Sequence, residues 1–186
     1  MPWLVIRNDE KKCSKEAFAK YYYGFVVMCP SARKRIQKGT SVYEYVSVRD
    51  CSFRSRNITH GVFVTINSQI KKIVSGNYYS LNPNEVSVES QVEQIENDNE
   101  NAELIVIKSR DDMSDTEAVF YCIRNAFAHG AFEIKGSGAK QLFLFESRRG
   151  DVLQGRIRLL KSNVDRILSI SKMTREEILK LRLKQR

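Results

Sequence analysis

The chain has 186 residues, of which 42% are hydrophobic and 28% are charged, and its formal net charge is +9. This length and composition are typical of one globular domain that needs no disulfide bonds, and they exclude a mainly disordered chain. No apolar run is long enough for a membrane span or a signal peptide, so we expect a cytoplasmic protein that does not contact a membrane.

The first part of the chain predicts helices more clearly than strands. Apolar side chains at helical spacing predict a helix over residues 14–28, and a short basic helix over 31–38 follows it. Residues 40–58 fit either a helix or a strand. Isoleucine and valine side chains then predict a helix from about 60 to 75, where we interpret His60 as a cap or surface residue rather than a site residue.

The middle of the chain is polar and acidic. Val88, Val92 and Ile95 have the spacing of a thin amphipathic helix within residues 80–102. The apolar run 104–107 fits either a buried strand or the start of another apolar element.

The clearest helix begins at Ser114. The four residues from Ser114 to Glu117 match a capping box, in which a serine and a glutamate three residues later satisfy each other's backbone N–H groups. Apolar side chains then occupy nearly every face of the helix, so we expect it to be central. We expect it to end at His129, with Gly130 directly after it.

After this helix the apolar period changes to two. Strands are predicted over residues 131–135, 141–145 and 152–160, with turns that contain glycine between them. They should form a compact antiparallel meander with basic tips. Ser162 and Thr174 then begin two further helices, of which the last is basic.

Three polar residues near the end of the central helix could carry chemistry. Arg124, Asn125 and His129 lie within six residues of one another. Histidine can take and give a proton near neutral pH, and arginine matches the geometry of a phosphate group. Cleavage of RNA by its own 2′-hydroxyl needs proton transfer and stabilisation of negative charge. We therefore take Arg124 and His129 as candidate catalytic residues and Asn125 as a residue that supports them.

A purely structural interpretation of the same residues stays open. Arg124 could pair with an acidic side chain, because a buried arginine is costly without a partner. Asn125 and His129 would then only finish the end of the helix.

The stretch Arg124-Asn125-Ala126-Phe127-Ala128-His129-Gly130 resembles the R-N-x-x-A-H-G variant of the HEPN-domain motif. The resemblance implies a mainly α-helical bundle, here a single domain over residues 1–186. The meander over 131–160 would be an appendage to it, followed by C-terminal helices over 161–186.

The resemblance also implies a function. HEPN proteins are typically homodimers whose composite sites cleave RNA without a metal, often as toxins or phage-defence effectors. A two-fold dimer would bring His129 and Arg124 of both protomers to one cleft. A cognate antitoxin or a nucleotidyltransferase-like regulator is an expected further partner.

The distribution of charge also favours RNA as a partner. Residues 1–72 and 135–186 each hold 14 Lys or Arg and 5 Asp or Glu, whereas residues 73–134 hold 3 and 12. Basic surface binds nucleic acid through release of counterions. Ordinary solvated faces would explain many of these charges equally well, and the acidic segment could instead bind a basic partner.

Neither a cofactor nor a metal is expected. The cysteines are widely spaced and should be reduced thiols, and only two histidines accompany them, so no zinc site is indicated. Carboxylates could still hold magnesium. Two rival functions remain beside the nuclease: a non-catalytic nucleic-acid or nucleotide-binding module, and a dimeric interaction protein.

Overall fold

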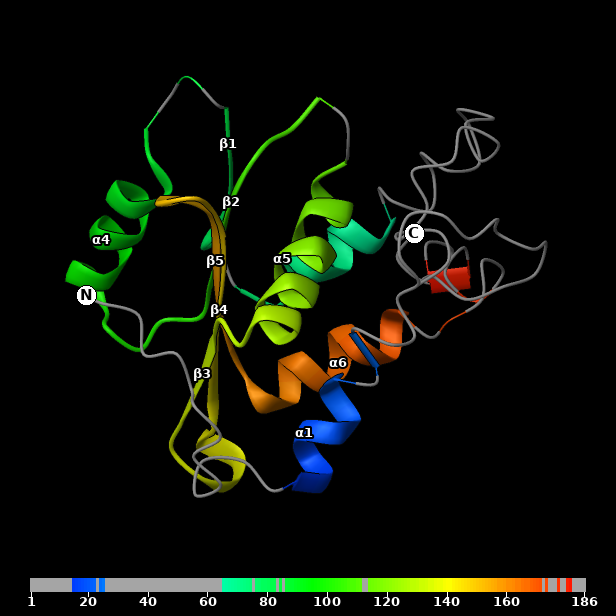
Figure 1. Cartoon of the computed structure of the whole chain (residues 1–186). Coiled ribbons are helices and arrows are strands. Elements are labelled where there is room, and N and C mark those ends of the chain that lie inside the picture. The colour runs from blue at the N-terminus through cyan, green and yellow to red at the C-terminus, as the bar shows by residue number, and fades with distance from the viewer. Residues whose placement is uncertain are drawn as a thin grey trace.

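The computed structural model of the chain has a five-stranded mixed sheet with helices on both of its faces (Figure 1). It describes residues 15–22, 24–25, 65–74, 76–82, 84, 86–111, 114–171, 173, 177 and 180–181.

The sheet combines one parallel and three antiparallel strand pairs. Its strands are β1 (Tyr78–Leu81), β2 (Leu104–Lys108), β3 (Phe132–Lys135), β4 (Leu142–Arg149) and β5 (Val152–Leu160). Their order across the sheet is β1-β2-β5-β4-β3. Only β1 and β2 are parallel.

Helix α4 (Val88–Asp98) connects the two parallel strands and covers one face of the sheet. A crossover connection is required because parallel neighbours cannot be joined by a hairpin. Val88, Val92 and Ile95 are buried against Leu104 and Val106 of β2, so the predicted amphipathic helix is confirmed.

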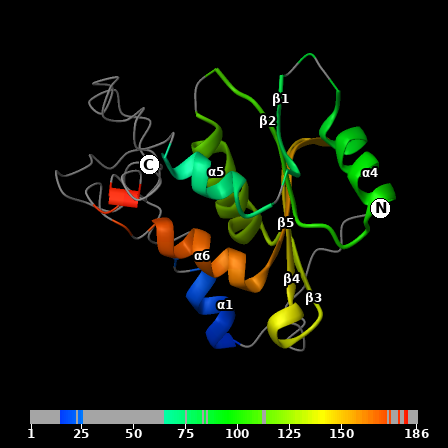
Figure 2. The ribbon, with the colours of Figure 1, turned by 180° about the vertical axis from the view of Figure 1, so that it is seen from behind.

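The opposite face carries the larger core. Helix α5 (Asp115–His129) lies along it, and α6 (Lys161–Ser171), α1 (Lys15–Tyr22) and helical residues 65–71 lie on the same side, as Figure 2 shows from behind. Phe127 of α5 packs near several aromatic rings, with centroids 4.8 to 6.2 Å away: Tyr21, Phe25, Phe132 and Phe145. Strand β2 therefore has apolar layers on both faces, which explains its uninterrupted apolar sequence.

The prediction of a mainly helical bundle is wrong. The three strands of the meander are not an addition to a helical core, because β5 pairs with β2 and lies at the centre of the sheet. Both apolar clusters are built on sheet residues as well as on helices. The fold is a mixed α/β fold.

Several local predictions are confirmed. Helix α5 has the capping box at Ser114 and Glu117, and Gly130 follows it in the left-handed conformation, with φ of 68°. The meander β3-β4-β5 is antiparallel, and β4 extends four residues beyond its predicted end. The apolar run 104–107 is a strand.

One strand of the sheet was not predicted, and some predictions concern residues that the structure does not describe. No strand was predicted at β1. The predicted elements at 31–38 and 40–58, and His60, lie outside the described residues.

Candidate nucleic-acid interface

The three predicted site residues occupy the second half of α5 but do not form one pocket. Arg124 Nη1 donates a hydrogen bond to Asn125 Oδ1 at 3.0 Å, and both side chains are half-buried. His129 is exposed in the last turn of the helix. It follows Asn125 by four residues and so lies one turn along the same face.

A cavity of about 710 Å³ opens beside the first half of α5. Three elements contribute to it: the segment that follows β2, the helix itself, and the hairpin between β4 and β5. The residues that line it are Ile107, Lys108, Ser109, Arg110, Asp111, Ala118, Tyr121, Cys122, Asn125, Ser147, Arg148, Arg149 and Gln154.

Asn125 is the only one of the three predicted site residues that lines this cavity. Arg124 is next to it in sequence and hydrogen-bonded to it, but does not itself line the cavity. His129 lies beyond the cavity by one helical turn. The motif and the cavity are therefore joined through Asn125.

The cavity wall is strongly basic. Lys108, Arg110, Arg148 and Arg149 line it, and among the described lining residues only Asp111 carries a carboxylate. Arg148 is held in place: its Nε donates to Glu146 Oε2 at 3.3 Å and its Nη1 to the carbonyl oxygen of Asp151 at 2.9 Å.

Lys108 and Arg149 differ from Arg148 in their lack of a carboxylate partner among the described residues. Within the part of the chain that the structure describes, no ion pair is formed by either of them. Two cations at one cavity without a carboxylate partner favour an anionic ligand.

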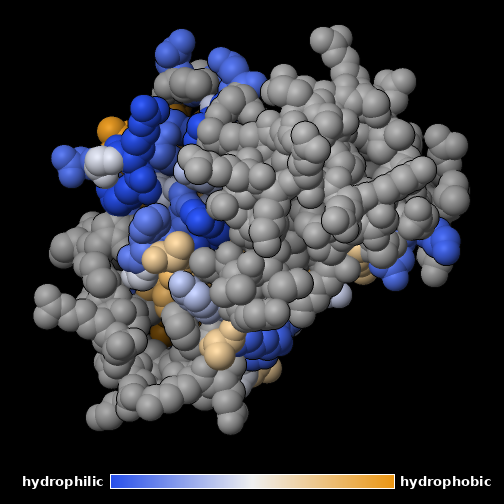
Figure 3. Space-filling model, turned by 45° about the vertical axis from the view of Figure 1, so that its right-hand side comes forward, coloured by the Kyte–Doolittle hydropathy of each residue, from blue (hydrophilic) through white to orange (hydrophobic). Residues whose placement is uncertain are grey.

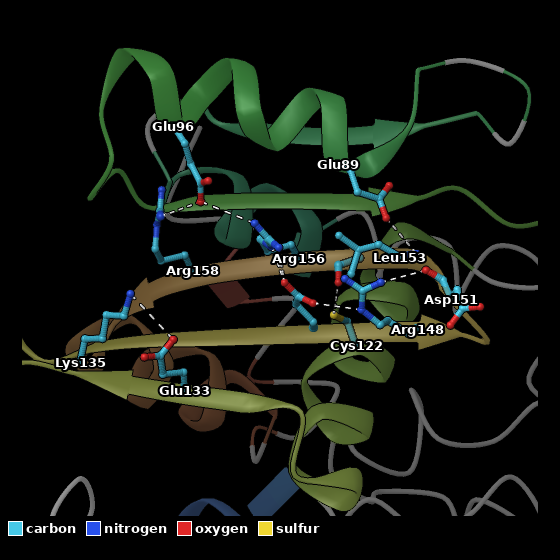
Figure 4. A network of polar contacts seen from close by, with 12 residues as sticks. Glu89, Glu96, Cys122, Glu133, Lys135, Arg148, Asp151, Leu153, Arg156 and Arg158 are labelled. Atoms are coloured by element: carbon cyan, nitrogen blue, oxygen red, sulfur yellow. Dashed lines mark hydrogen bonds and ion pairs between the residues drawn. The ribbon is translucent and has the colours of Figure 1, made fainter. Parts of the chain in front are cut away.

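A network of alternating positive and negative side chains stabilises the β4–β5 hairpin (Figure 4). Arg158 Nη1 donates to Glu96 Oε1 at 2.9 Å, and Arg156 Nη1 lies 3.7 Å from the same oxygen. Arg156 Nε in turn donates to Glu146 Oε1 at 2.6 Å. The network continues to Arg148, and it connects α4 to β5 and β4.

Glu146 is the buried carboxylate of this network of ion pairs. Only 2% of its surface is exposed. Burial raises the pKa of its carboxyl group, and Arg156 and Arg148 act in the opposite direction. Breaking one side of such a buried network is costly, since it leaves a charge without compensation. The network therefore keeps the backbone at Arg148 and Arg149 in place.

A β-bulge shapes the same hairpin. Ser147 pairs with Gly155 and Arg148 pairs with Leu153, so Gln154 is an extra residue between two strand pairs. Bulges redirect side chains at the edge of a site. Here the bulge coincides with the placement of Gln154 in the cavity wall.

Cys122 lies at the base of the cavity but is not activated. Its thiol is buried and donates a long hydrogen bond of 3.6 Å to the carbonyl oxygen of Gly155. Burial, and secondarily the charge of Glu146, raises the pKa of the thiol. A protonated thiol is a poor nucleophile, so packing is the role this geometry supports.

Among the described side chains, no group of three or more His, Cys, Asp and Glu could hold a metal ion. No helix in the described ranges has the length and apolarity needed to cross a bilayer. On the face drawn in Figure 3, hydrophilic side chains gather at the upper left, and apolar ones form only small separate areas.

No protein-family model matches the chain, and neither does any curated protein sequence or solved structure.

Part of this interface was predictable from the sequence, namely Asn125 and the basic tips of the meander where Arg148 and Arg149 lie. Lys108 and Arg110 were not predicted. The available signal was their position at the end of a buried strand and shortly after it. Nothing in the sequence indicated that these segments would converge.

Proposed function

We propose that this protein binds RNA at the cavity beside α5. The observation that carries the proposal is the convergence of four basic side chains with Asn125 in one cavity. Arginine and lysine bind phosphate oxygens, and arginine does so through two parallel hydrogen bonds. Asparagine adds a donor and an acceptor for a ribose or base.

A charge-reversal experiment tests this proposal. We expect Lys108→Glu combined with Arg149→Glu to weaken binding of a labelled single-stranded RNA by at least about tenfold in a fluorescence anisotropy titration. Each lost phosphate contact removes counterion release from the binding free energy. Lys135→Glu combined with Lys140→Glu is the matched control, because it reverses the same number of charges. Lys135 and Lys140, the latter on the short helix η3 (Gly138–Lys140), are exposed and do not line the cavity. Equal weakening by the control would reject the cavity as the binding site.

Cleavage of the bound RNA is the second candidate function, and the exposure of His129 favours it. The imidazole of His129 is exposed to a ligand, and it shares a helix face with Asn125 in the cavity wall. An RNA strand that leaves the cavity along α5 would pass this side chain. His129 would transfer the proton and Arg124 would stabilise the charge that develops on the phosphate.

This second function is tested by an RNA-cleavage assay in the presence of EDTA. Wild-type protein should cleave single-stranded RNA without a metal. His129→Ala should abolish cleavage and keep RNA affinity. Cleavage that persists in His129→Ala would remove this residue from the mechanism, and binding without any cleavage by the wild type would leave an RNA-binding protein.

A homodimer and a role as a toxin or defence effector belong to the cleavage hypothesis. One imidazole cannot easily act as base and acid in one concerted step, so a second protomer would supply the other. Sedimentation equilibrium should then show a dimer. The expected antitoxin or nucleotidyltransferase-like regulator rests on the resemblance of the motif alone, and the expected cytoplasmic location rests on the lack of a long apolar run in the sequence.

A further inference from the structure

We infer that the cavity takes an unstacked base from single-stranded RNA, with Tyr121 as the stacking surface. This inference rests on the proposed RNA binding and specifies which form of RNA the site accepts. Its basis is an aromatic ring placed among the cations and amides of the cavity.

Tyr121 is an unusual residue for its position. It is one of the few large hydrophobic side chains that remain exposed among the described residues, with 39% of its surface accessible. Its neighbours Cys122 and Ala118 also line the cavity but are buried, whereas Tyr121 is exposed there. An exposed aromatic side chain in a cavity wall is a surface on which a base can stack.

Arg110 lies over one face of the Tyr121 ring, with its guanidinium carbon 5.7 Å from the ring centre. Guanidinium planes and aromatic rings both stack on nucleobases, and a cation beside the ring strengthens the interaction. The pair therefore offers a stacking platform that carries a positive charge.

The polar groups around the platform suit the edge of a base. Asn125 and Gln154 contribute amide groups to the same cavity, from α5 and from the bulge in β5. Each amide has donors and an acceptor, which can pair with the Watson–Crick edge of an unpaired base. Lys108 and Arg149 would then hold the phosphates on either side of that base.

This arrangement excludes paired bases. In an A-form duplex the bases stack on each other and the major groove is too narrow for side chains to read. A base can reach Tyr121 only when it has left the stack. The site should therefore bind single strands and reject duplexes of equal charge.

The test compares three ligands of equal phosphate number. They are a 2′-O-methyl oligo-uridine, a strand in which every base is replaced by an abasic spacer, and a duplex of a half-length oligo-uridine with its complement, whose two strands together carry the same number of phosphates. The 2′-O-methyl group blocks cleavage by the 2′-oxygen, so affinity can be measured on intact ligand. Titrations use the full chain and fluorescence anisotropy.

We expect the oligo-uridine to bind most tightly. Tyr121→Ala should weaken its binding by roughly tenfold, since stacking is worth about that per base, and should not change the affinity for the abasic strand. Tyr121→Phe should keep the wild-type affinity because the ring remains. Tyr22→Ala serves as the aromatic control, since Tyr22 is also exposed but lies on α1, away from the cavity.

Equal affinity for the oligo-uridine and the abasic strand would overturn the inference and leave RNA binding through phosphates intact. The same holds if the duplex binds as tightly as the single strand, or if Tyr121→Ala has no effect. If none of the three ligands binds, the proposed function itself fails. Thermal unfolding of each variant shows whether a lost affinity comes from a lost fold.

Discussion

Gly155 lies where Cys122 of α5 packs against the sheet. A Cβ atom at this position would lie 3.2 Å from Cys122 Sγ and 3.3 Å from Ile107 Cγ2. Both neighbours are buried, and neither can move far in a close-packed core. The glycine therefore sets the separation between the helix and the strand under the cavity.

We expect Gly155→Ala to lower the free energy of unfolding by about 1–3 kcal/mol, because an added methyl group strains a packed interior. Urea-induced unfolding followed by circular dichroism measures this change. Cys122→Ala removes the atom that the new methyl group would meet. The double variant should thus be more stable than the sum of the two single costs predicts. Additive costs would show that the contact with Cys122 is not the cause.

At the scale of single elements, α5 is defined by its two ends. Ser114 Oγ accepts a hydrogen bond from the backbone N–H of Glu117, and Glu117 Oε2 accepts one from the backbone N–H of Ser114. At the other end, Gly130 has φ of 68°, a conformation that costs side-chain-bearing residues energy.

Replacing either end residue should destabilise the protein without changing the cavity. Ser114→Ala should cost about 1 kcal/mol through the lost cap. Gly130→Ala should cost about 1 kcal/mol through backbone strain, since nothing lies within 4 Å of the added methyl group. Urea unfolding measures both. Wild-type stability of Gly130→Ala would contradict the assigned backbone conformation.

Helices α1 and α6 are joined by one carboxylate. Asp165 accepts hydrogen bonds from Lys20 at 2.5 Å, from Tyr21 at 2.9 Å and from Lys161 at 2.9 Å. Partial burial raises the pKa of Asp165, but these hydrogen bonds outweigh that effect and lower the pKa below its ordinary value of 3.8. A lowered pKa stabilises the fold above the ordinary value, and this stabilisation is lost as the pH falls through the folded pKa.

Asp165→Asn should therefore be less stable than the wild type at neutral pH. The difference should be about 0.5–1 kcal/mol, because the ion pairs are partly exposed and screened by solvent. As the pH falls below 3.8, the difference should shrink. Denaturant titrations across this range measure it, and a difference that is independent of pH would exclude the ionised carboxylate as its source.

The elements also show what a single sequence can and cannot predict. Helix α5 and the meander were predictable because their capping residues, turn glycines and periodicities are local signals. Strand β1 was not, because four residues, Tyr78–Leu81, give too short a pattern. Its parallel pairing with β2 is a long-range contact that periodicity does not encode.

At the scale of the whole molecule, the position of β5 decides both fold and site. Because β5 pairs with β2 on one side and β4 on the other, it joins the βαβ unit to the meander. This arrangement brings Lys108 and Arg149, 41 positions apart in the sequence, to one cavity. The sequence showed that both ends of the chain are basic. It could not show which basic residues meet, because that depends on strand order.

The salt dependence of RNA binding tests the central claim most directly. For a single strand, the slope of log affinity against log salt concentration falls by about 0.7 for each phosphate contact. Lys108→Ala combined with Arg149→Ala should therefore reduce the magnitude of this slope by about 1.4, while Lys140→Ala leaves it unchanged. Identical slopes for the wild type and the double variant would contradict the assignment of the cavity as an RNA-binding site.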